Sequence, residues 1–155
     1  MQRRTLISLC AAAAVSPVLA HHGWSSFDTD RPIYLEGTAL KVAWRNPHAE
    51  LDLQLPADLR LAPNLAQRPL PSQSAAVDGK RLLSLAQLPT RKDRVWHIEL
   101  APLTRLEAWG VAEIKAGDAI SVLGFTFAQD KGEAVLRAEY LFAAGKAYGL
   151  RSSPA

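Results

Sequence analysis

The clearest hydrophobic pattern in the chain is a strict alternation over residues 48–55. Apolar side chains occupy every second position there, and polar side chains fill the positions between them. The apolar positions are Ala49, Leu51, Leu53 and Leu55. This pattern predicts a strand with one buried face. Residues 95–101 alternate in the same way, and residues 102–109 then predict a short helix that Gly110 ends.

Two other segments alternate but change parity along their length. Residues 33–44 and 119–127 each begin with apolar residues on one parity and end with them on the other. A glycine lies near each change, Gly37 in the first segment and Gly124 in the second. Glycine accommodates the distortion that an extra residue causes in a strand. We therefore predict a bulge near Gly37 and a kink at Gly124.

The C-terminal region completes the predicted sheet. A turn over residues 129–132 leads into a strand over residues 134–142, and a short strand follows Gly145. We expect one face of the longer strand to carry Leu136, Ala138, Tyr140 and Phe142. Three strands, a short helix and two or three more strands, with glycine kinks, predict a mainly β fold: a small OB-like β-barrel. A β-sandwich with one helix is the alternative, because alternation alone does not show closure.

A proline-rich segment at about residues 56–94 interrupts the strands. It carries five prolines among scattered polar residues, with a possible helical turn over residues 80–88. An irregular segment of this length is unusual in a compact domain and is either functional or mobile. We favour a mobile loop within a single domain over a second domain.

The first twenty residues have the layout of an export signal. Arg3 and Arg4 precede an apolar run over residues 6–18, and the residues before Ala20 resemble a cleavage site. We predict a signal peptide over residues 1–20, a mature domain over residues 21–155 and a periplasmic location. The arginine pair also resembles a twin-arginine signal, so export by that route or by the general secretory route stays open. The apolar run is too short to span a bilayer, which predicts no membrane anchor.

Cleavage changes what the composition implies. The one cysteine, Cys10, lies in the leader, so the mature chain has no thiol and no disulfide. The formal net charge of +3 falls to +1 when Arg3 and Arg4 leave with the leader. A nearly neutral mature chain gives no indication of nucleic-acid binding.

Several motifs together resemble a family of small exported bacterial proteins of unknown function. These are the mature His-His start followed by Gly-Trp-Ser-Ser-Phe-Asp at residues 21–28, Trp44-Arg45-Asn46-Pro47-His48, Trp96-His97-Ile98-Glu99, and the Gly-Asp strand opener at residues 117–118. The resemblance spans most of the mature chain. It implies a small periplasmic β-domain and brings no established activity.

The mature N-terminus is the strongest candidate for chemistry. Cleavage after Ala20 would leave His21 with a free α-amine and an imidazole, which together can chelate a metal ion. Nitrogen ligands without a thiolate favour copper(II), and the arrangement resembles the histidine brace of copper oxygenases and copper carriers. We predict a copper(II) site made by His21 and His48 and assisted by His22. The alternative is a frayed, solvated N-terminus.

The fourth histidine, His97, fits this site less well. If the strands over residues 48–55 and 95–101 pair antiparallel, His97 lies on the order of 15 Å from His48, at about 3.3 Å per residue. One ion could not join both. We expect Glu50, Asp52, His97 and Glu99 to line one outer face, where they support a site or meet water.

No motif in the sequence names a reaction. Neither a nucleophile elbow nor a Gly-rich oxyanion loop accompanies the serines and histidines, and no catalytic residue is assigned. The sequence favours a non-enzymatic role, with a metal ion or a periplasmic protein as the partner. The alternative function is a metal-free module that holds a protein, peptide or saccharide on the barrel face and its tryptophans, although four tryptophans in a small domain are more often core packing.

Overall fold

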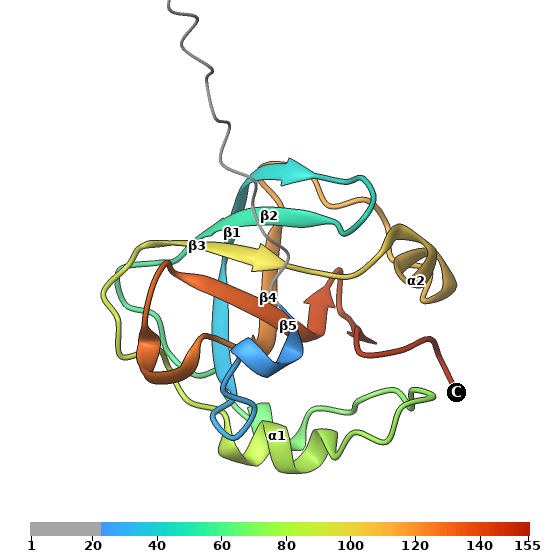
Figure 1. Ribbon diagram of the computed structural model, residues 1–155, viewed down its shortest axis with the longest axis horizontal. Helices are drawn as coiled ribbons and strands as arrows, with labels where there is room; N and C mark the ends of the chain where they lie inside the picture. Colours follow the sequence, from blue (N-terminus) through green and yellow to red (C-terminus); the bar gives the residue numbers. More distant parts are fainter. Residues whose placement is uncertain (1–22) are drawn as a thin grey trace, which may run out of the picture.

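The computed structural model describes residues 23–155, which form one sheet of six strands curled into a barrel (Figure 1). The strands are β1 (Ile33–Ala43), β2 (Glu50–Gln54), β3 (Val95–Glu99), β4 (Ala119–Phe125), β5 (Val135–Ala143) and β6 (Lys146–Gly149). The helices are α1 (Gly79–Leu85) and α2 (Leu103–Ala108), with short 3-10 turns at η1 (Trp24–Ser26), η2 (Leu65–Gln67) and η3 (Ala128–Asp130).

The barrel closes through a parallel pair. The strand order is β3-β2-β1-β4-β5-β6, and β3 also pairs with β5 in parallel, so the first five strands form a closed ring. The short helix α2 lies between β3 and β4 in the chain and buries Leu106 in the core. This architecture confirms the OB-like barrel and excludes the open sandwich.

The alternating segments supply the barrel interior. In β2 and its flanks, Ala49, Leu51, Leu53 and Leu55 are all buried, as the sequence predicts. In β3, Trp96 and Ile98 are fully buried. Helix α2 ends as expected, because Gly110 takes a positive φ of 64° and donates its N–H to the carbonyl of Glu107.

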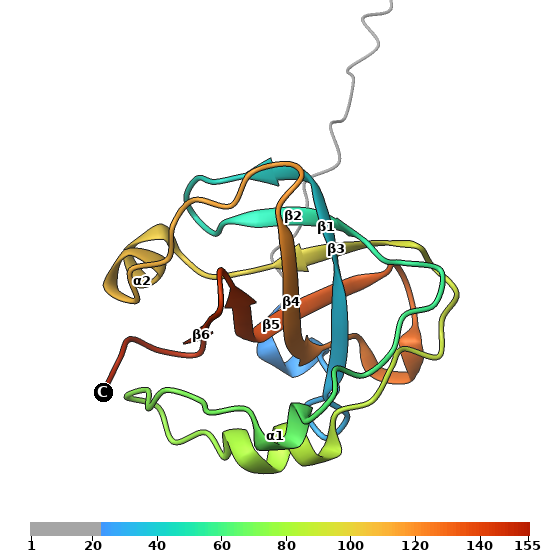
Figure 2. The same ribbon diagram turned by 180° about the vertical axis from the view of Figure 1, so that it is seen from behind.

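The bulge in β1 lies a few residues later than predicted. The register with β2 shifts between Ala39 and Val42, and not at Gly37. Gly37 has another role, since a Cβ there would lie 2.1 Å from the carbonyl oxygen of Gln54. The first half of β1 pairs with β4 and the second half with β2, and Thr38 pairs with both. The glycine therefore allows close backbone approach where β1 passes from one partner to the other (Figure 2).

Strand β5 contains a bulge that the sequence pattern hides. Leu123 pairs with Tyr140 while Gly124 pairs with Ala138, so Glu139 is an extra residue in β5. The predicted kink at Gly124 is confirmed, but the predicted common face of β5 is wrong. Leu136 and Ala138 belong to the barrel core, whereas Tyr140 and Phe142 belong to a second cluster outside the barrel. The extra residue turns the later side chains to the opposite face.

The proline-rich segment covers this second cluster. Leu65 and Leu83, from η2 and α1, are buried beside Tyr34, Tyr140 and Phe142. The same segment is tied to the C-terminus, where the backbone N–H of Ser74 donates to the carbonyl of Ser153. These contacts argue against the expectation of a mobile loop, because the segment packs as an outer layer on the barrel (Figure 1). None of the helices in residues 23–155 is long and apolar enough to cross a membrane.

Candidate functional site

The predicted metal ligands lie partly outside the described residues. His21 and His22 precede residue 23, so the structure places neither of them. His48 is half-buried and lies two residues before the start of β2, after a cis peptide bond between Asn46 and Pro47. Within residues 23–155, no group of three histidine, cysteine, aspartate or glutamate side chains could hold a metal ion. The prediction takes the other ligands of His48 from His21 and His22, which lie outside the described residues.

The predicted outer face of β2 and β3 is confirmed. Asp52 lies opposite His97, and Glu50 lies opposite Glu99. The His97 ring approaches both carboxylates of β2, with Nδ1 3.3 Å from Asp52 Oδ1 and Nε2 3.6 Å from Glu50 Oε2. His48 is four residues from Asp52 along the chain, which is about 13 Å at ~3.3 Å per residue. The register supports the expectation that one ion cannot join His48 and His97.

An aromatic and cationic stack beside this face went unpredicted. Two guanidinium groups contact the Trp24 ring, with Arg151 Cζ 3.7 Å and Arg137 Cζ 4.8 Å from the ring centroid. Arg137 also faces Glu99 across the β3–β5 pair, with Nε 3.7 Å from Oε2. Cation–π contacts of this kind fix a ring in position. The chain is thus anchored two residues after His22.

Arg151 joins this stack to a buried acid. Glu139, at the β5 bulge, is fully buried and accepts hydrogen bonds from Arg151 Nε at 2.8 Å and Nη2 at 2.6 Å. Gln73 Nε2 donates a longer bond of 3.4 Å to the other carboxylate oxygen. Burial raises the pKa of the Glu139 carboxyl above its ordinary value, although Arg151 acts in the opposite direction. No local sequence signal joins residues so far apart along the chain.

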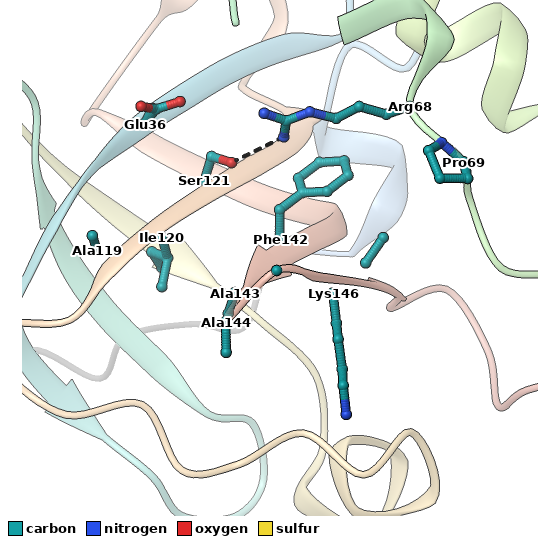
Figure 3. A pocket seen from close by; sticks show the side chains of 12 residues that line it. Glu36, Arg68, Pro69, Ala119, Ile120, Ser121, Phe142, Ala143, Ala144 and Lys146 are labelled. Atoms are coloured by element: carbon teal, nitrogen blue, oxygen red, sulfur yellow. Dashed lines mark hydrogen bonds between the residues drawn. The ribbon is translucent and has the colours of Figure 1, made fainter.

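A pocket of about 450 Å³ lies on the outer face of β4, between the barrel and the proline-rich segment. Its floor includes Phe142 and Ser121, and Arg68 lies over it from the residue after η2 (Figure 3). Glu36 of β1 lies at the same rim. The sequence analysis assigned no role to Arg68, because a single arginine in a proline-rich segment carries no motif.

The tryptophans mainly serve packing. Trp96 is fully buried, while Trp44 and Trp109 pack partly against the barrel core. Trp109 Nε1 donates a 2.8 Å hydrogen bond to the carbonyl of Ser152, and Trp24 lies in the arginine stack. The four rings do not form the common aromatic platform that a saccharide module would present.

Comparison with known proteins found a similarity for only the N-terminal part of the chain. No curated protein and no solved structure matches the chain. Residues 8–59 match the model of a family described as a family of unknown function, DUF6152. The match includes both the His-His pair and Asn46-Pro47-His48, and it ends shortly after β2. Over about a third of its length the chain is therefore similar to DUF6152, a family to which no activity is assigned.

Proposed function

We propose that this chain is an exported periplasmic β-barrel domain that binds copper(II) through the α-amine and imidazole of His21 together with His48, assisted by His22. The observation that carries the proposal is the Trp24 anchor. Arg151 and Arg137 hold the Trp24 ring at 3.7 and 4.8 Å. This stack fixes the point from which the mature N-terminus extends.

The strand register supports the distances that such a site needs. Arg137 of β5 lies opposite Glu99 of β3, which lies opposite Glu50 of β2. His48 is two residues before Glu50, so it lies two strands across and two residues along from Arg137, on the order of 12 Å. Three residues of extended chain reach about 10 Å, and they separate the His21 amine from Trp24. The reach of these three residues is therefore comparable with the distance from Arg137 to His48.

The charges on this face also favour a cation. Glu50 and Asp52 lie on the same outer surface as the Trp24 anchor, and His97 lies between their carboxylates. Of the positive groups nearby, Lys41 is 88% exposed and 3.9 Å from Asp52. The two arginines of the Trp24 anchor each have a carboxylate partner, Glu99 for Arg137 and Glu139 for Arg151. Amine and imidazole nitrogens are ligands that copper(II) prefers among divalent ions.

Extending the N-terminus should abolish tight copper binding. The protein would be prepared beginning at His21, and a second copy would carry three extra alanines before it. A single alanine would make His22 the third residue, where the amine, two backbone amides and the imidazole themselves chelate copper(II). We expect the three extra residues to weaken copper(II) affinity roughly a hundredfold, equivalent to about 2.7 kcal/mol, because they remove the amine from the chelate. Competition titration would give the affinities, and paramagnetic resonance would report the number of nitrogen ligands.

Two histidine variants complete this experiment. His48→Ala should weaken binding about tenfold or more, whereas His97→Gln should leave the affinity of the native N-terminus unchanged. Equal affinity of the extended and native copies would disprove the chelate. A loss with His97→Gln but not with His48→Ala would move the site to the β2–β3 carboxylates. Absence of binding in all copies would leave a metal-free module as the function.

Copper affinity should fall with acidification. Ordinary α-amines titrate near pH 7.7–8.0 and ordinary imidazoles near pH 6.5, and both must lose a proton to bind the ion. We expect binding to weaken steeply as the pH falls towards about 5–6. Titrations of the native protein between pH 5 and 8 would measure this change. An affinity that stayed the same across that range would argue for carboxylate ligands alone.

A further inference from the structure

The pocket beneath Arg68 is separate from the proposed copper site. It lies on the outer face of β4, β5 and β6, beside Arg68 and Pro69 of the proline-rich segment (Figure 3). Its volume of about 450 Å³ is within the range of small-molecule sites. Alanines and Phe142 supply most of the apolar lining, and the polar groups come from Glu36, Arg68, Ser121 and Lys146.

Two aromatic rings hold Arg68 in place. Its Cζ lies 4.9 Å from the centroid of the Phe142 ring and 6.0 Å from that of Tyr34. The guanidinium has five N–H donors, and its one side-chain hydrogen bond in the described part of the chain is a 3.5 Å contact to Ser121 Oγ. None of the ion pairs in residues 23–155 includes Arg68. The rings therefore orient a cation whose donors remain available to a ligand.

Glu36 supplies the opposite charge at the same rim. It is the cross-strand partner of Ser121, and it accepts a hydrogen bond from the Tyr34 hydroxyl. Figure 3 shows the Glu36 carboxylate and the Arg68 guanidinium on either side of Ser121. The two groups are not within ion-pair distance of each other. Arg68 and Glu36 thus place one positive and one negative group at the same end of the pocket, next to an apolar floor, while Lys146 at the other end points away from both (Figure 3).

This arrangement selects among ligand classes by charge. A simple carboxylate would be attracted by Arg68 but repelled by Glu36. A simple amine would be attracted by Glu36 but repelled by Arg68. A ligand with adjacent carboxylate and ammonium groups pairs with both. We propose that this pocket binds a free α-amino acid with an apolar side chain: the carboxylate contacts Arg68 and Ser121, the ammonium contacts Glu36, and the side chain lies on Phe142.

Three matched ligands test the proposal on the full mature protein. L-phenylalanine carries both charges, 3-phenylpropionate lacks the ammonium group and 2-phenylethylamine lacks the carboxylate. Titrations followed by amide NMR should give saturable shifts at Ser121, Phe142 and Ala147. We expect phenylalanine to bind about tenfold more tightly than either truncated ligand.

Two charge variants assign the contacts. Arg68→Gln should lower the affinity for phenylalanine about tenfold without weakening the binding of phenylethylamine. Glu36→Gln should lower the affinity for phenylalanine without weakening that of phenylpropionate. Arg81→Gln is the matched control, because Arg81 is exposed on α1 and away from the pocket. Its affinities should equal those of the native protein.

A blocking variant guards against effects on folding. Ala119 is exposed at the start of β4 and lines the pocket, so Ala119→Trp fills the space without entering the core. It should abolish binding of all three ligands. Equal affinities for the three ligands in the native protein would overturn the proposal, as would an absence of shifts at the pocket. Arg68→Gln and Glu36→Gln losses that are the same for every ligand would also overturn it, because they would show that the substitutions disturb the pocket and do not remove charge-specific contacts.

Discussion

Arg151→Ala should lower the free energy of unfolding by about 3–5 kcal/mol at neutral pH, because it leaves a buried carboxylate without its partner. Glu139 is fully buried, and Arg151 supplies its two shortest hydrogen bonds, at 2.8 and 2.6 Å. The remaining donor, Gln73, lies 3.4 Å from the other oxygen. Urea denaturation of the native protein and the variant at pH 7.5 would measure the difference.

The pH dependence of this loss follows from the raised pKa of Glu139. A carboxyl whose pKa is higher in the folded state favours folding below its ordinary value, and this contribution is lost as the pH rises through the raised value. Without Arg151 the pKa rises further, so the variant should be closer to the native protein at pH 5 than at pH 7.5. Adding Glu139→Gln to the variant should recover most of the stability. An equal loss at both pH values, with no recovery, would contradict an unpaired charge as the cause.

Gly124→Ala should cost about 3 kcal/mol or more, at the upper end of the effects of overpacking. A Cβ at this position would lie 2.1 Å from the carbonyl oxygen of Arg137 and 2.9 Å from Cα of Ala138. Both are backbone atoms of the neighbouring strand, opposite the β5 bulge, so relief requires that β4 and β5 separate. Thermal and urea unfolding would measure the loss.

The matched control for this substitution is Gly23→Ala. Its Cβ would meet only Ser25 Oγ, at 3.7 Å, and its backbone is extended with a φ of −65°. We expect a change within about 0.5 kcal/mol, as for ordinary surface substitutions. A similar loss for both variants would mean that loss of glycine itself, and not the close approach, governs stability.

The strands could be predicted where one face is buried and the other meets solvent. In β2 and β3, alternation predicted both the buried residues and the outer face with Glu50, Asp52 and His97, because the period of a strand is two. The barrel order followed from the sequence of elements. The bulge at Glu139 could not be predicted, since Leu141 is apolar as well as Tyr140 and Phe142, and either face of β5 gives an acceptable pattern.

The candidate sites depend on contacts that the sequence does not report. Trp24 meets Arg151 across almost the whole described part of the chain, and Arg68 meets Ser121 and Phe142 across the barrel surface. Residue type suggested the histidine chelate, because imidazole chemistry is specific to few residues. An arginine oriented by two rings has no comparable signal, since its role comes from where the proline-rich segment packs.

The parallel β3–β5 pair also determines how well the barrel resists self-association. Each strand from β1 to β4 has two neighbours, and β5 has three, because β3 and β6 share the side that does not pair with β4. In the described part of the chain, β6 alone pairs on one side, and it is four residues long and begins with Lys146. Short edges that carry lysine are poor templates for strand addition by another molecule. The fold thus offers little edge for aggregation at the concentrations of a crowded compartment.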